Sequence, residues 1–142
     1  MERAPLLLHA SCVAWQGRAV LVTGPSGSGK SALALALIGL GCQLVADDRT
    51  RLALAGGALW ASCPPAIRGL IEARGAGLLF APPLPAARLV LAAALDRPET
   101  ERLPPERCVT YMGRSLPLLH NIGTDRFAQA ILQYLKAGRR EP

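Results

Sequence analysis

The sequence is poor in aromatic residues and lysine, and it has no long apolar run. Aromatic residues make up 4% of the chain, and its 16 basic residues are spread along the sequence without forming a dense cluster. Few rings are therefore present for bases to stack on, which argues against a nucleic-acid-binding protein despite the net charge of +6. Because arginine carries almost all of that charge, it indicates either a compositional bias or an anionic partner.

Membrane and secretory segments are also missing. No apolar run reaches the roughly 18 to 20 residues of a membrane span, and the run at 5–8 is too short for the core of a signal peptide. We therefore expect a cytoplasmic protein with no membrane contact. The cysteines are few and contain no CxxC pair, which in a reducing compartment predicts small core residues and neither disulfides nor a zinc site. They are Cys12, Cys42, Cys63 and Cys108.

The length and composition predict one folded domain. A chain of 142 residues with 51% hydrophobic residues is large enough to bury a core and too apolar to be disordered. No repeat or linker interrupts it. We therefore predict a single domain over residues 1–142.

The chain is organised around a glycine-rich stretch with the spacing G-x-x-x-x-G-K-[ST]. The β-branched run 18–23 that precedes it is typical of a buried strand, and the Ala/Leu-rich run 31–40 that follows is typical of a helix. A strand, a glycine loop and a helix in this order predict a phosphate-binding loop. Its residues are Gly24, Pro25, Ser26, Gly27, Ser28, Gly29, Lys30 and Ser31.

Each type of residue in this loop suits a nucleoside triphosphate. The glycines let successive backbone N–H groups point at phosphate oxygens, beside the positive end of the following helix. Lys30 supplies a charge for the β- and γ-phosphates, and Ser31 a hydroxyl for Mg²⁺. We therefore predict binding of ATP with Mg²⁺. The alternative, a glycine turn that caps an ordinary helix, would leave Lys30 without a role, although only one other lysine is present in the chain.

Two consecutive acids follow the next expected strand, 43–46. If this strand runs parallel to 18–23 through a crossover, Asp47 and Asp48 reach the edge of the sheet where the phosphates lie. Because neighbouring side chains on a strand point in opposite directions, one aspartate would face the γ-phosphate and the other would secure the loop. The pattern does not say which does which, and an acidic turn after a strand is the alternative.

Two further residues are candidates for the same site. Glu72 lies in an apolar stretch, 67–80, between two arginines, so it is either a plain ion-pair partner or a second magnesium ligand. His9 falls in an expected first strand, 6–15, near the edge of the sheet, and is either structural or catalytic.

The remaining chain predicts ordinary elements. A hairpin is expected over 52–60 with a Gly-Gly turn, followed by strands over 88–95, 108–112 and 114–119 and a surface loop over 96–107 that holds Arg102. A last helix is expected from 124, with apolar residues at helical spacing on its core face. These are Phe127, Ile131, Leu132 and Leu135.

Several of these segments together resemble the catalytic domain of HPr kinase/phosphorylase. The segments are His9-Ala10-Ser11, the 24–31 loop, Leu44-Val45-Ala46-Asp47-Asp48 and Ile71-Glu72-Ala73-Arg74-Gly75-Ala76-Gly77. The resemblance runs from about His9 to Phe80 and thins beyond it. It implies an α/β fold, a P-loop-containing mixed sheet with flanking helices related to phosphoenolpyruvate carboxykinase.

The resemblance also implies an activity and a set of roles. The activity is ATP-dependent phosphorylation of a serine of HPr, the phosphocarrier protein of the sugar phosphotransferase system, by an oligomer that is usually a hexamer. Lys30 would hold the phosphates, Ser31 and Glu72 would bind magnesium, and Asp47 or Asp48 would take the serine proton. His9 falls on the family's site histidine, and Arg102 on a later active-site arginine.

Two features depart from the family pattern. The usual family member has an additional N-terminal domain, which this sequence lacks, so the chain resembles a short form. The family also has an arginine-containing segment near its end that is tied to the reverse reaction, phosphorolysis of seryl-phosphate. The counterpart here, Leu116-Pro117-Leu118-Leu119-His120-Asn121-Ile122, has neither arginine. The reverse activity and the role of His120 are therefore left open.

Three other functions compete with that of a serine kinase. A small-molecule P-loop kinase would need a long arginine-bearing lid, which the sequence lacks. A regulatory nucleotide-binding module without catalysis would not need three acids beside the phosphates. A nucleic-acid-dependent NTPase is disfavoured by the small size and the few aromatic residues.

Overall fold

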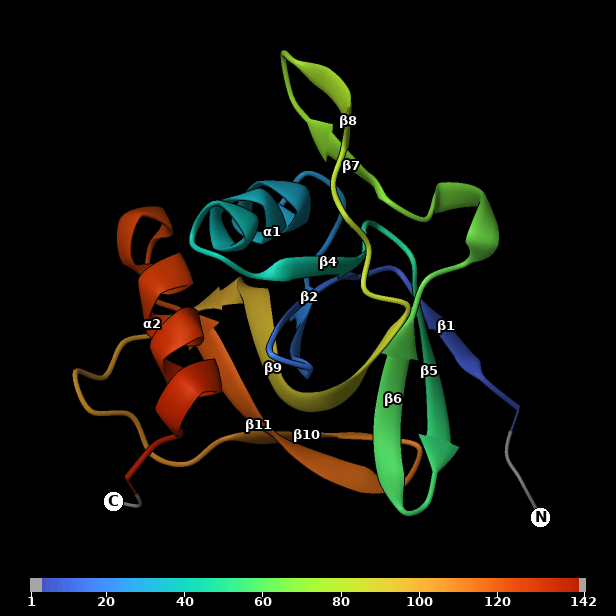
Figure 1. Cartoon of the computed structure of the whole chain (residues 1–142). Helices are drawn as coiled ribbons and strands as arrows, with labels where there is room; N and C mark the ends of the chain where they lie inside the picture. The colour runs from blue at the N-terminus through green and yellow to red at the C-terminus, as the bar shows by residue number, and fades with distance from the viewer. Residues whose placement is uncertain (1–3, 141–142) are drawn as a thin grey trace.

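The structure, a computed structural model, describes residues 4–140 and contains a curled mixed sheet with two α-helices on one face (Figure 1). Helix α1 spans Lys30–Gly39 and α2 spans Thr124–Ala137. The first six strands are β1 (Leu6–Leu8), β2 (Ser11–Trp15), β3 (Arg18–Thr23), β4 (Gln43–Ala46), β5 (Thr50–Ala55) and β6 (Ala58–Ser62). They are followed by β7 (Leu70–Ala73), β8 (Gly77–Phe80), β9 (Ala86–Pro98), β10 (Cys108–Tyr111) and β11 (Arg114–Asn121).

Strand β9 is the centre of the main sheet, whose order is β1-β5-β6-β9-β3-β2-β4. One edge of β9 pairs in parallel with β3. Along its other edge, the first residues of β9 pair with β6 in the antiparallel direction, and its later residues pair with β11 in the parallel direction. The aliphatic run at its middle is buried, as expected for a strand covered on both faces. Because β3, β9 and β11 are parallel, their carboxyl ends meet at one edge, and the 24–29 loop leaves from that edge.

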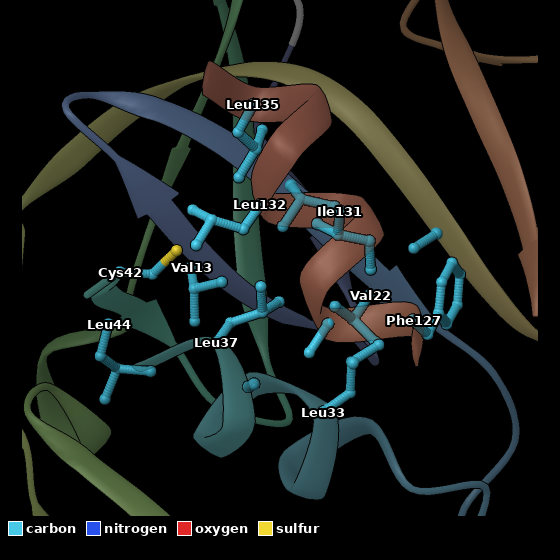
Figure 2. Close-up of a cluster of buried hydrophobic side chains, with 14 of the residues drawn as sticks. Val13, Val22, Leu33, Leu37, Cys42, Leu44, Phe127, Ile131, Leu132 and Leu135 are labelled. Atoms are coloured by element: carbon cyan, nitrogen blue, oxygen red, sulfur yellow. The ribbon is translucent and has the colours of Figure 1, made fainter. Parts of the chain in front are cut away.

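One face of the sheet packs against both helices. Leu33 and Leu37 of α1 and Phe127 and Ile131 of α2 meet strand residues such as Val22 in one buried cluster (Figure 2). This confirms the apolar face predicted for the last helix. It also ties the helix that follows the glycine loop to the centre of the sheet.

The other face is covered by the sheet itself. A second buried cluster contains Leu21, Leu52, Leu59, Leu89 and Leu116, which come from β3, β5, β6, β9 and β11. The strong curl of a twisted sheet lets its own strands close over this side. The mixed α/β sheet is therefore as expected, but its two helices flank one face only.

Helix α1 ends at a glycine in a left-handed conformation. Gly41 has a φ of 110°, and its N–H donates to the Ile38 carbonyl at 3.0 Å, while the Cys42 N–H donates to the Leu37 carbonyl at 3.0 Å. This pair of bonds is a Schellman ending, which satisfies the last carbonyls of the helix.

Two sequence-based expectations need correction, and a third is confirmed. The strand expected over 6–15 is broken at His9, because β1 pairs with β5 whereas β2 pairs with β3 and β4. The strand expected over 88–95 extends to Pro98, because pairing with β11 holds its last residues in the sheet. The expected parallel direction of β4 and β3 is confirmed, with β2 lying between them and antiparallel to both.

The cysteines and the helices bear on two other expectations. The thiols of Cys12, Cys42 and Cys63 are free and buried as predicted, whereas Cys108 is exposed on β10, so the prediction that it is a core residue is wrong. Burial raises the pKa of Cys42 to about 11. Neither helix within residues 4–140 has the length and apolar character to span a membrane.

Candidate active site

The glycine loop turns sharply between β3 and α1. Gly27 and Gly29 have φ values of 83° and 101°, in the left-handed region that strains other residues. A Cβ atom at Gly24 would lie 2.5 Å from Ser28 Oγ and 3.2 Å from Leu95 Cβ, so its neighbours would have to shift to admit a side chain. The sequence therefore selects glycine where the backbone must bend and approach itself closely.

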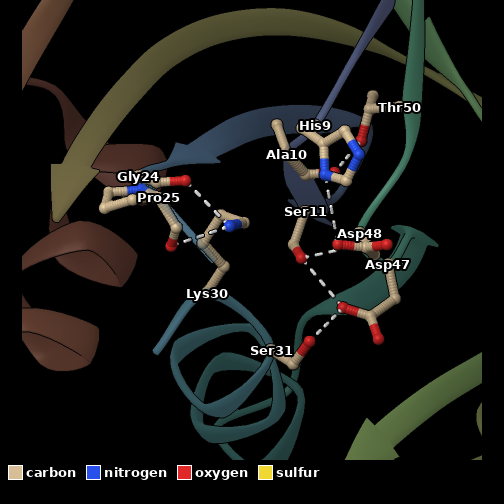
Figure 3. A network of polar contacts seen from close by, with 10 residues as sticks. All are labelled: His9, Ala10, Ser11, Gly24, Pro25, Lys30, Ser31, Asp47, Asp48 and Thr50. Atoms are coloured by element: carbon tan, nitrogen blue, oxygen red, sulfur yellow. Dashed lines mark hydrogen bonds and ion pairs between the residues drawn. The ribbon is translucent and has the colours of Figure 1, made fainter. Parts of the chain in front are cut away.

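Lys30 lies folded back over the loop. Its Nζ donates hydrogen bonds to the carbonyls of Gly24 at 2.8 Å and Pro25 at 3.1 Å (Figure 3). The first turn of α1 has no side-chain cap and no acidic residue. Its free N–H groups and the Lys30 ammonium therefore form a positive region suited to an anion.

Asp47 is buried, and both of its carboxylate oxygens accept hydrogen bonds (Figure 3). Its Oδ1 accepts hydrogen bonds from the hydroxyls of Ser11 at 2.8 Å and Ser31 at 2.7 Å. Its Oδ2 accepts the backbone N–H of Glu72 at 3.0 Å. Asp47 thus joins β2, the start of α1 and β7 at one point.

Asp48 has a different environment. Its φ of 64° is unusual for a residue other than glycine, and its backbone N–H donates to Ser11 Oγ at 3.1 Å. The carboxylate is exposed and lies 3.6 Å from Nδ1 of His9, which sits at the bend between β1 and β2 (Figure 3). The left-handed backbone turns Asp48 away from the buried position of Asp47 and leaves its carboxylate accessible.

A cavity of about 670 Å³ lies beside these residues, a size that fits a small-molecule ligand. Its lining combines loop residues, one side of α1, Asp48 and the last part of β7. The residues are Ser26, Gly27, Gly29, Lys30, Ser31, Ala32, Leu35, Ala36, Asp48, Glu72, Ala73 and Arg74. The cavity is positive at the loop, carboxylate-bearing at Asp48 and Glu72, and apolar along α1.

Most of the predicted site residues are brought together. Of the predicted site residues, Gly24, Pro25 and His9 do not line the cavity, and Asp47 lies beneath it. Those that line it are Ser26, Gly27, Gly29, Lys30, Ser31, Asp48 and Glu72. Ser28 does not line the cavity, and its Oγ is buried with no hydrogen-bond partner among the described residues. Arg102 is exposed on the loop between β9 and β10, and it is not among the residues that line the cavity.

The sequence alone did not single out three contributors. Ser11 links the two aspartates, Arg74 lines the cavity from the end of β7, and Leu35 lies on the side of α1 that faces it. Arg74 is the first residue of the turn after β7, two residues beyond Glu72. The role of Ser11 depends on the pairing of β2 with β4, which no local pattern reveals.

The oxygens at Ser31 and Asp47 suit a magnesium ion. Mg²⁺ is held by one or two carboxylates and hydroxyls together with substrate phosphates, and the Ser31 hydroxyl and Asp47 carboxylate lie 2.7 Å apart beside the cavity. Within residues 4–140 no group of three or more His, Cys, Asp or Glu side chains could hold a metal by itself. The residues present therefore fit a magnesium site in which the substrate's phosphate oxygens supply some of the ligands.

Comparison with known proteins agrees with this arrangement. The family profile described as "HPr Serine kinase C-terminal domain" matches residues 4–83. The chain belongs to this family. The matched range includes His9, the 24–31 loop, both aspartates and Glu72, but neither Arg102 nor the 116–122 segment.

Individual members of the HPr Serine kinase C-terminal domain family are similar over part or most of the chain. The HPr kinase/phosphorylase of Bordetella petrii is 50% identical over 64 residues, 44% of this chain and 21% of that protein. That of Clostridium tetani is 43% identical over 77 residues, 54% of this chain and 25% of that protein. The chain thus spans about a quarter or less of the length of these relatives.

The fold is similar over a longer range. The structure of the Hpr(Ser) kinase/phosphatase from Coxiella burnetii superposes with a TM-score of 0.77 at 29% identity, covering 92% of this chain and 88% of that one. The similarity of fold therefore continues beyond residue 83, where the family profile ends.

Proposed function

We propose that this chain is an ATP- and Mg²⁺-dependent kinase that phosphorylates a serine of an HPr-type phosphocarrier protein. The observation that carries the proposal is the difference in burial and hydrogen bonding between the two aspartates. Asp47 is buried and bonded to the Ser31 hydroxyl, whereas Asp48 presents an exposed carboxylate at the cavity. A site that only bound a nucleotide would not need the second carboxylate.

The triphosphate would lie along the glycine loop. The N–H groups of the loop and of the first turn of α1 would bind phosphate oxygens. Lys30 would exchange its two loop carbonyls for the β- and γ-phosphates. The nucleoside would extend along the apolar side of α1 at Ala32, Leu35 and Ala36 toward Arg74, where the cavity continues.

Magnesium would be held by Ser31 and Asp47, with Glu72 reaching the same ion or its water ligands from β7. Bound there, the ion neutralises the charge that develops on the phosphate oxygens. The chain's own contribution is to fix the ligands, since Asp47 is held in place by Ser11 and by the backbone of Glu72.

Asp48 would act as the base. Its carboxylate accepts the proton of the seryl hydroxyl, the hydroxyl oxygen bonds to the γ-phosphorus, and the bond from that phosphorus to the β–γ bridging oxygen breaks, which releases ADP. Asp47 is less suited to this role, because it is buried, its oxygens accept three hydrogen bonds, and this scheme assigns it to the magnesium ion. His9 is a positioning residue in this scheme: it lies against Asp48 and orients its carboxylate.

Other properties implied by the family stay proposals. An oligomeric assembly is one, and a role for Arg102 is another. Arg102 would have to act through movement of its loop or in a neighbouring subunit, because it does not line the cavity of its own chain.

The proposal is tested by transfer of labelled phosphate from ATP to purified HPr in the presence of magnesium. We expect labelled serine with the unaltered chain, loss of transfer and of ATP binding with Lys30→Ala, and loss of transfer alone with Asp48→Asn. Tight ATP binding with no labelled HPr would overturn the kinase assignment and favour a nucleotide-binding regulatory module. Adding inorganic phosphate to the labelled product then tests the reverse reaction.

A further inference from the structure

A row of two arginines and two tryptophans crosses four neighbouring strands at the amino end of β3. Trp15 of β2 pairs in register with Arg18 of β3, Arg18 with Arg88 of β9, and Arg88 with Trp60 of β6. Residues in register on adjacent strands project from the same face of a sheet. The two tryptophans, the only ones in the chain, thus flank the two arginines.

Three residues of this row are exposed to solvent, namely Arg18, Arg88 and Trp60. Trp15 is half-buried, with Lys136 Nζ 4.7 Å from the centre of its ring. In contrast, Arg18 and Arg88 are exposed, and Trp60 is 39% exposed. Over residues 4–140, neither guanidinium forms an ion pair.

Two like charges side by side on adjacent strands oppose folding. No carboxylate of the described residues offsets the Arg18–Arg88 pair, although the chain has ten acidic residues that could have supplied one. Features that weaken a fold in this way tend to coincide with functional sites. Two neighbouring guanidinium groups are suited to a phosphate, which each can bind through a fork of N–H donors.

The spacing of the row adds a requirement on the ligand. Adjacent strands lie about 4.8 Å apart, so the Trp60 position is about 7 Å from the midpoint between Arg88 and Arg18. That span corresponds to one sugar between an aromatic base and its phosphate. An exposed indole binds a base by stacking, whichever base it is.

We propose that Arg18, Arg88 and Trp60 form a second nucleotide-binding site, for a nucleoside monophosphate. The guanidinium groups bind the phosphate, and the Trp60 ring stacks on the base. This site is separate from the glycine loop: Arg18 and Thr23 are the two ends of β3, about 17 Å apart at about 3.3 Å per residue. It does not depend on the function proposed above, because none of its residues lines the cavity.

The test is a titration of the full chain with adenosine monophosphate, followed by equilibrium dialysis and by tryptophan fluorescence. We expect saturable binding with quenching. Arg18→Ala, Arg88→Ala and Trp60→Ala should each weaken it about ten-fold or more, since each removes a charged hydrogen-bond donor group or the stacking surface. Arg126→Ala, which removes an exposed arginine of α2 outside the row, should leave the affinity unchanged, as should Lys30→Ala.

The controls separate this site from the glycine loop and from a site for phosphate alone. Loss of binding in Lys30→Ala would place the nucleotide on the glycine loop and overturn the proposal. The proposal would also be overturned if Arg18→Ala and Arg88→Ala bound adenosine monophosphate as tightly as the unaltered chain, or if the unaltered chain showed no saturable binding. Inorganic phosphate and ribose 5-phosphate are the comparison ligands, and both should bind about ten-fold more weakly because they lack a base. Equal binding of either would overturn the nucleotide assignment. Because each variant replaces an exposed side chain, we expect the fold to be retained, and thermal unfolding of each variant checks this.

Discussion

At the scale of single residues, the two consecutive aspartates lie in different environments, and the left-handed backbone of Asp48 is what sets them apart. The φ of 64° at Asp48 sends its carboxylate toward solvent, whereas Asp47 is held below by Ser11, Ser31 and the Glu72 N–H. Asparagine tolerates a left-handed backbone as readily as aspartate does. We therefore expect asparagine at position 48 to remove the proposed base without loss of stability, whereas asparagine at position 47 should lower stability and also weaken the proposed magnesium site.

For Asp48→Asn we expect the fold and ATP binding to be retained and phosphoryl transfer to fall by about 10²-fold or more, because the base is removed. For Asp47→Asn we expect the free energy of unfolding to fall by about 1–3 kcal/mol. The asparagine oxygen could still accept the two seryl hydroxyls, but its NH₂ group would face the Glu72 N–H, two donors without an acceptor.

Urea unfolding and the transfer assay measure the two effects on the same preparations. The same loss of stability in both variants would contradict the distinction drawn between the two carboxylates. Undiminished transfer by Asp48→Asn would remove it as the base.

At the scale of elements, the loop between β9 and β10 is closed by one forked ion pair. Arg107 donates from Nε to Glu99 Oε1 at 3.0 Å and from Nη2 to Oε2 at 2.9 Å. The backbone N–H groups of Thr100 and Glu101 also donate to Oε2. Chiefly through the Arg107 hydrogen bonds, the pKa of Glu99 is lowered from 4.5 to about 2.

This gives the loop a defined dependence on pH. A carboxylate whose pKa is lower in the folded state stabilises it fully above the ordinary value of 4.5 and loses that contribution as the pH falls toward 2. We expect backbone amides of residues 99–107 to lose protection from hydrogen exchange over this range, and Glu99→Gln to abolish the dependence. Glu106→Gln, which alters an exposed carboxylate of the same loop, is the control, and an unchanged pH profile in Glu99→Gln would refute the prediction.

Elements defined by neighbouring residues could be predicted from the sequence, whereas pairings between distant strands could not. The strand, glycine loop and α1 follow from contiguous spacing, and the β5–β6 hairpin follows from Gly56-Gly57, whose φ values of 58° and 77° match a tight hairpin turn. The central place of β9 depends on its pairing with β3, far away in sequence. The Arg18–Arg88–Trp60 row and the role of Ser11 follow from the same kind of long-range register, so no local pattern indicated them.

At the scale of the whole molecule, the β7–β8 hairpin exposes apolar side chains that are suited to contact between copies of the chain. It forms a two-stranded sheet separate from the main one, and β8 presents Leu78 and Phe80 with exposed fractions of 69% and 92%. Apolar side chains gathered in this way are characteristic of an interaction surface. The family resemblance implies an oligomer. Glu72 of the cavity pairs in register with Leu78, so contacts on β8 would also hold the side of β7 that lines the cavity.

We therefore expect the Leu78→Ser/Phe80→Ser double variant to shift the chain from an oligomer to a monomer, because the contact would lose its apolar surface while each chain keeps its core. Size-exclusion chromatography with light scattering measures the mass, and thermal unfolding checks the fold. Leu103→Ser is the matched control, since Leu103 is 77% exposed on the loop between β9 and β10. An unchanged mass in the double variant, or dissociation by Leu103→Ser alone, would place the contact elsewhere. If dissociation occurs and phosphoryl transfer falls with it, the hairpin links assembly to the position of Glu72 and Arg74 in the cavity.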